Sequence, residues 1–117
     1  MKKVVNDREL VYFTMLFKET ALDGHNSRGK CLKLTAALVP MLNVVGVPCV
    51  LTTGDVWATN VKGEVIGRTF HAWVTLKDGR ILDPTLEQFP EARTLEMNAG
   101  IYLGRKLEWM KAHGEGR

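Results

Sequence analysis

The sequence contains only two cysteines in 117 residues, Cys31 and Cys49. Two cysteines at this separation form neither a CxxC pair nor the even-numbered framework of a small disulfide-rich domain. Together with the histidines they also lack the short paired spacings of a zinc site. We therefore expect free thiols, a reducing cytoplasmic environment, and neither a metal nor another cofactor.

A long apolar run is also missing. The N-terminal residues have two lysines followed by only two apolar residues before Asn6, which is too few for the hydrophobic region of a signal peptide. The most apolar window, residues 36–51, is interrupted by prolines and polar residues, whereas a membrane helix needs about 20 consecutive apolar residues. We therefore expect no export by a signal peptide and no membrane partner.

The charge of the chain is small and scattered. The net charge is +3 and the isoelectric point is near 9.0, but the sequence has no basic run and no interleaved aromatic platform. These features argue against nucleic acid as a partner. With 45% hydrophobic and 25% charged residues, the composition is ordinary for one compact domain, which we expect to span residues 1–117.

Two helices are expected first. Residues 6–23 begin with the cap residues Asn6 or Asp7, carry apolar residues at helical spacing and end before Gly24. A second apolar stripe of helical period starts at Cys31 and closes at Gly46. Its members are Cys31, Leu34, Leu38, Met41, Leu42 and Val45. Since a proline inside a helix removes a hydrogen bond, Pro40 predicts a kink near Ala37 or a break into two short helices.

Three antiparallel strands and a last helix are expected after Gly46. The segments 47–58, 65–76 and 81–85 are rich in β-branched and aromatic residues and are separated by turn residues. Residues from about 91 to 112 repeat apolar side chains at helical spacing, although Gly100 and Gly104 weaken that helix. The sequence therefore predicts an α+β domain with N-terminal helices on a short antiparallel sheet and a C-terminal helix.

The position of Cys31 suggests nucleophilic chemistry. In the first turn of a helix, unpaired backbone N–H groups and the positive end of the helix dipole favour a thiolate. Such a nucleophile needs a base and a third group to orient that base. His71 on the second predicted strand and Asp83 on the third are the candidates for these two roles. A zinc site or a structural cysteine is the alternative for Cys31, and packing in the core is our interpretation of Cys49.

The same residues carry a resemblance to a known family. The chain resembles the transglutaminase-like superfamily of the papain-like fold over residues 29–85. The matching segments are Gly29-Lys30-Cys31, residues 46–54, "HAWV" from His71 and "DGRILDPT" from Asp78. The resemblance implies a papain-like core and a catalytic triad of Cys31, His71 and Asp83, which would act on a peptide or protein substrate through a thioester. The chain also looks like the small peptidases that process lasso-peptide precursors, and the subfamily stays open.

Three further residues are candidates for the oxyanion and substrate site. His25 and Asn26 precede Cys31 closely enough to donate a hydrogen bond to an oxyanion beside the helix start. Trp73 lies on the strand face of His71 and is a candidate wall of the cleft, although a tryptophan in a core strand often only packs. Alternatives to an enzyme of this family are a non-catalytic binding module with the same fold and a redox-active thiol protein that uses Cys49.

The turn between the second and third strands decides whether His71 and Asp83 share a face. A two-residue loop at Asp78-Gly79 would place them on opposite faces, since moving the register by one residue reverses every side chain. A three-residue loop, residues 77–79, places Asp83 opposite Trp73 and one diagonal step from His71. Such a loop needs a left-handed residue where Gly79 stands, so we predict the three-residue turn, or a bulge with the same effect.

Overall fold

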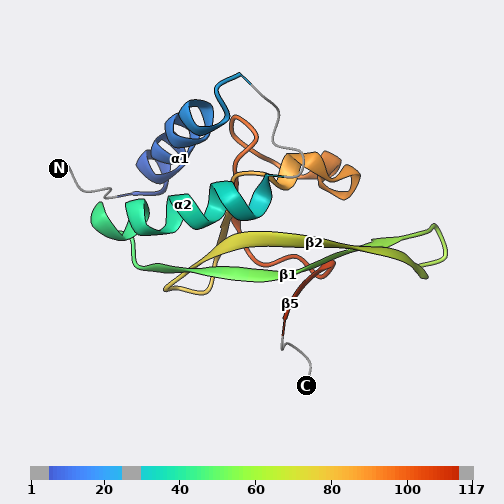
Figure 1. The fold of residues 1–117 in the computed structure, drawn as a ribbon. Helices are drawn as coiled ribbons and strands as arrows, with labels where there is room; N and C mark the ends of the chain where they lie inside the picture. The colour runs from blue at the N-terminus through green and yellow to red at the C-terminus, as the bar shows by residue number, and fades with distance from the viewer. Residues whose placement is uncertain (1–5, 25–29, 114–117) are drawn as a thin grey trace.

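The structure is a computed structural model that describes residues 6–24 and 30–113. Two helices come first in the chain and the strands follow, as Figure 1 shows. Helix α1 spans Asp7–Leu22 and helix α2 spans Cys31–Val44. This order confirms the predicted α+β class with its helices ahead of an antiparallel sheet. Within the described residues, no helix has the length and apolar character needed to cross a bilayer.

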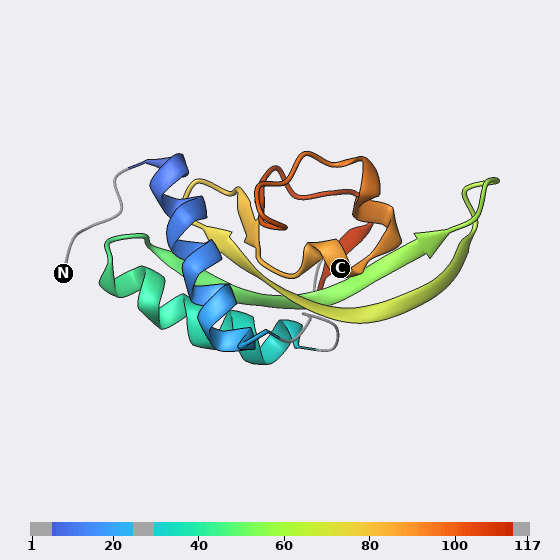
Figure 2. The same cartoon turned by 90° about the horizontal axis from the view of Figure 1, so that it is seen from above.

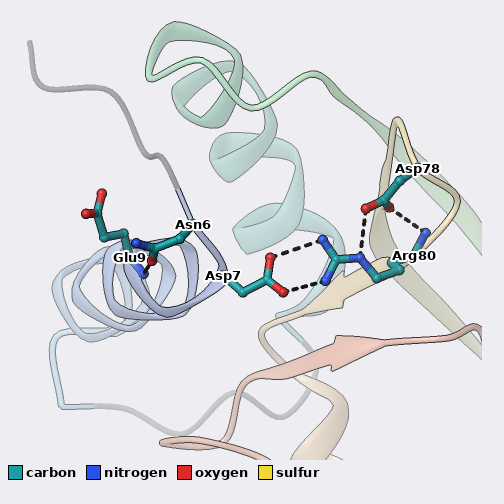
Figure 3. Close-up of polar contacts among 5 residues, drawn as sticks. All are labelled: Asn6, Asp7, Glu9, Asp78 and Arg80. Carbon is teal, nitrogen blue, oxygen red and sulfur yellow. Dashed lines mark hydrogen bonds and ion pairs between the residues drawn. The ribbon is translucent and has the colours of Figure 1, made fainter.

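The start of α1 is capped as predicted and is tied to the sheet. The Asn6 side chain accepts a hydrogen bond of 2.8 Å from the backbone N–H of Glu9, which satisfies one of the free donors of the first turn. Arg80 donates to Asp7 at 2.7 Å and to Asp78 at 2.8 Å, as Figure 3 shows. These contacts join the first turn of α1 to the turn between two strands.

Helix α2 presents the predicted stripe to the sheet with one exception. Cys31, Leu34, Leu38, Leu42 and Val45 are buried, whereas Met41 is 38% exposed. The helix also runs as one element through Pro40, so the predicted break into two helices is wrong. Pro40 and Ala36 both lie on the exposed side of α2, where water can bond the Ala36 carbonyl that loses its helical partner.

The sheet has five antiparallel strands in the order β4-β3-β2-β1-β5. The bounds of the first three are Cys49–Thr59 for β1, Val65–Leu76 for β2 and Ile81–Asp83 for β3. At the β2–β3 turn, Leu76 N–H donates to the Arg80 carbonyl at 2.8 Å, and Gly79 has φ 91°. Val74 pairs with Leu82, so the register confirms the predicted three-residue loop.

Each face of the sheet supports its own core cluster. Helices α1 and α2 cover one face, where Leu38 and Leu42 pack with Val74 and Leu82. The other face holds Trp73 together with Ile81, Phe89, Tyr102 and Met110. Because neighbouring residues of a strand point to opposite faces, His71 and Asp83 lie on the face of Trp73 and Ile81.

The predicted C-terminal helix is wrong. Residues 86–112 form two short 3-10 helices, η1 (Leu86–Gln88) and η2 (Pro90–Thr94), and two edge strands, β4 (Tyr102–Gly104) and β5 (Met110–Ala112). Ala99 and Gly100 have φ values of 52° and 76°, which no helix accommodates. Strand β4 pairs with β3 and β5 pairs with β1, so the chain passes between opposite edges of the sheet.

Gly54 of β1 is opposite His71 and has no room for a side chain. An added Cβ would lie 2.1 Å from the Lys111 carbonyl oxygen and 2.7 Å from the Trp73 ring. Gly54→Ala is therefore expected to lower the free energy of unfolding by about 3 kcal/mol, the upper range for an overpacked core. Urea denaturation measures this loss. Gly67→Ala is the matched control, because a Cβ there meets nothing within 4 Å, and an equal loss in both variants would contradict the prediction.

Candidate active site

His71 lies in the interior of the domain and is held by Asp83. Both side chains are 0% exposed, and His71 Nε2 donates to Asp83 Oδ2 at 2.6 Å. The β2–β3 register produces this contact, because continuing it by one residue from Val74–Leu82 places Asp83 opposite Trp73 and diagonal to His71. Since Nε2 carries the proton of this bond, Nδ1 is the nitrogen available to another group.

Asp83 is in turn held by the chain that follows it. The backbone N–H of Thr85 donates to Asp83 Oδ1 at 3.0 Å, and the Thr85 hydroxyl lies 3.5 Å from the same oxygen. One carboxylate oxygen thus faces Thr85 and the other faces His71. The sequence alone does not single out Thr85, although an aspartate side chain commonly accepts from the backbone N–H two residues farther along the chain.

Two aromatic rings fix the plane of the imidazole. The Phe89 ring meets His71 edge to face, with centroids 4.7 Å apart and an interplanar angle of 82°, and the Trp73 centroid is 5.9 Å away. Trp73 is fully buried, so it packs beside the imidazole as predicted but offers no surface to a substrate. Phe89 was not predicted as a site residue, because nothing in its local sequence links it to His71.

Cys31 is the first residue of α2 and is buried near His71. Burial acts to raise the pKa of the Cys31 thiol, but the polar contact and charge of His71, with the backbone N–H groups of Ala72 and Leu32, lower that pKa below its ordinary value. Among the described residues, His71 Nδ1 makes no hydrogen bond of regular geometry. The structure thus brings Cys31, His71 and Asp83 together.

The imidazole favours its protonated form. Burial acts to lower the pKa of His71, but its hydrogen bond with Asp83, the polar contact with Cys31 and the negative charges of both groups raise that pKa to about 9. A thiol with a lowered pKa beside an imidazole with a raised pKa favours a thiolate–imidazolium pair near neutral pH. This is the protonation state that a cysteine nucleophile uses.

Cys49 has a different environment. It lies at the start of β1, beyond the far end of α2, and 14 helical residues extend about 21 Å. Burial raises the pKa of the Cys49 thiol. Asn43 Nδ2 lies 3.6 Å from its sulfur, and both cysteines are free thiols. Cys49 is therefore too far from Cys31 to serve as its redox partner.

Two predicted residues fall outside this description. His25 and Asn26 lie in the segment 25–29, outside the described residues, so their expected oxyanion role stays a prediction. Within residues 6–24 and 30–113, no cluster of three or more His, Cys, Asp or Glu side chains could hold a metal ion.

Comparison with protein-family models, curated proteins and solved structures found no match to this chain. The resemblance to the transglutaminase-like superfamily therefore depends on the sequence motifs within residues 29–85 alone.

Proposed function

We propose that this protein is a cysteine-dependent hydrolase or acyltransferase that acts on amide bonds through a thioester at Cys31. One observation carries the proposal. A fully buried imidazole donates from one ring nitrogen to Asp83 at 2.6 Å and interacts through its charge with a thiol at the start of a helix. If His71 only stabilised the core, nothing would require a neighbouring thiol with a lowered pKa, whereas a nucleophilic site does require one.

The proposed reaction has two stages. The Cys31 thiolate attacks the amide carbonyl and forms a carbon–sulfur bond, and the His71 imidazolium gives its proton to the amine as the carbon–nitrogen bond breaks. Asp83 keeps the ring oriented and stabilises its positive charge. Water or an amine then attacks the thioester, with His71 accepting the proton, which yields an acid or a new amide and restores the thiol.

The tetrahedral oxyanion needs donors beside the sulfur. The N–H groups of Leu32 and Ala72, which lower the pKa of the thiol, flank that position. An oxyanion donor typically contributes about 3–4 kcal/mol to the transition state. We propose that these two backbone groups supply that stabilisation, with His25 and Asn26 as additional candidates.

An activated ester tests the proposed acyl-enzyme without knowledge of the natural substrate. Treatment with benzyloxycarbonyl-glycine p-nitrophenyl ester is expected to place the acyl group on Cys31, as a mass increase on the Cys31 peptide that hydroxylamine removes. The Cys49→Ala variant should keep this adduct, and Cys31→Ala should lose it. A folded protein that neither forms an adduct on Cys31 nor releases p-nitrophenol faster than its Cys31→Ala variant would be a binding module instead. Glycine amide added as an acceptor distinguishes transfer from hydrolysis.

A further inference from the structure

Strand β2 has one unpaired edge that leads to the candidate active site. It pairs with β1 from Val65 to Leu76, but with β3 only through Val74 and Thr75. Among the described residues, the segment 65–72 therefore has a strand partner on one side only. Figures 1 and 2 show that β1 and β2 extend as a two-stranded arm beyond the end of α2 at which Cys31 lies.

The backbone groups along this edge alternate in direction, and the turn shows which ones face outward. Leu76 N–H donates toward β3, to Arg80, whereas Lys77 N–H donates toward β1, to Pro48. Because backbone groups alternate along a strand, the N–H and C=O groups at positions 72, 70 and 68 point to the unpaired edge. The alternation stops at Gly67, because the register of β2 against β1 shifts between Gly67 and Val65. The backbone groups at positions 71 and 69 point to β1, with which they pair in the sheet.

The row of outward groups ends at the nucleophile. The N–H group of Ala72, its last member, is one of the groups that lower the pKa of the Cys31 thiol. Farther along the row, every residue from 65 to 70 is exposed, including Phe70 at 45% and Ile66 at 67%. An exposed apolar strand edge is a template for pairing, which proteins usually protect unless they use it.

We propose that an extended peptide segment of the substrate adds to this edge as a further strand, pairs with the exposed backbone of residues 68 and 70, and so brings its reactive amide to Cys31 and the Ala72 N–H group. The inference rests on the proposed function, since it assigns the substrate of the same site. A substrate peptide is a better occupant of this edge than a second copy of the chain. The outward backbone groups of β2 lead directly to the N–H donors around the Cys31 sulfur, where a substrate must bind. Backbone hydrogen bonds supply affinity for peptides of many sequences, and the side chains at alternate peptide positions supply selectivity.

A peptide electrophile tests the proposal on the intact protein. The probe is trans-epoxysuccinate with a Val-Thr-Val peptide amide on each carboxyl group, so that one arm can follow the edge in either direction. The Cys31 thiolate opens the epoxide, a carbon–sulfur bond replaces a carbon–oxygen bond, and the alkoxide takes the proton of His71. The control is the epoxysuccinyl bis-methylamide, which has the same reactive group and no strand to add.

The extended probe is expected to modify Cys31 at least about tenfold faster than the short control, because two or three backbone hydrogen bonds form. N-methylation of successive probe amides should slow the reaction at alternate positions only, which is the signature of strand pairing. Arg68→Pro removes an outward N–H without breaking the bonds to β1 and should slow the extended probe alone. Arg68→Ala keeps that N–H and should slow the extended probe far less than Arg68→Pro does.

Iodoacetamide separates the two ways in which the proposal can fail. If Cys31 does not react with iodoacetamide faster than Cys49, the proposed function and the strand inference fall together. If Cys31 reacts fast but the two probes react equally, or if N-methylation has no alternating effect, the strand inference is overturned and the function stands. If Arg68→Pro fails to fold, the N-methylation series on the native chain decides. Dimers that form through this edge and exclude the probe would also overturn the inference.

Discussion

Iodoacetamide is expected to label Cys31 in the His71→Ala variant on the order of 10 to 100 times more slowly than in the native protein at about pH 6. His71 is the side chain that lowers the pKa of the Cys31 thiol, and burial alone would raise it. Each unit by which a thiol pKa rises above the pH costs about tenfold in thiolate. Peptide mapping by mass spectrometry measures the rate at Cys31 and Cys49 in the same sample.

Cys49 is the internal control for this experiment. It lies far from His71 and its thiol has a raised pKa, so its labelling should be slow and equal in both proteins. Because His71 is buried, His71→Gln provides a second variant of similar size in case alanine destabilises the fold. If both variants are folded and label Cys31 at the native rate, His71 does not activate the thiol, and the proposed mechanism is refuted.

The relation between His71 and Asp83 was predictable because it depends on a local turn. The three-residue loop of Lys77, Asp78 and Gly79 determines the strand register, and Gly79 adopts the positive φ that this loop requires. Strand parity then places the histidine and the aspartate on one face. The first two helices were predictable for a similar reason, since caps and apolar periodicity act within a few residues of each other.

The C-terminal segment was not predictable from the same kind of signal. Its apolar residues recur at helical spacing, yet Leu107 and Met110 pack on the sheet face opposite the helices, and Gly100 makes a turn. Pairing of β4 with β3 and of β5 with β1 involves strands distant in sequence, so no local pattern reports it. The contact between Phe89 and His71 was not predictable for the same reason, because only the tertiary fold brings the two rings together.

Asp83→Ala is expected to lower the free energy of unfolding by about 3–5 kcal/mol, since it removes one member of a buried ionic pair and leaves the other without its partner. Asp83 accepts hydrogen bonds from both His71 and Thr85, and all three residues are buried. Urea denaturation at about pH 7 measures the loss. Asp83→Asn is the matched variant, because an amide of the same shape can still accept from Thr85 but carries no charge.

The two variants separate the structural role of Asp83 from its chemical role. In Asp83→Asn the fold should persist with a smaller loss of stability, while the pKa of His71 should fall below its native value of about 9, because a hydrogen-bonded negative charge is gone. NMR titration of the imidazole measures that shift. A less basic His71 holds the thiolate less well, so Cys31 should label more slowly at about pH 6. If Asp83→Asn leaves both the His71 pKa and the labelling rate unchanged, Asp83 stabilises the core and does not tune the nucleophile.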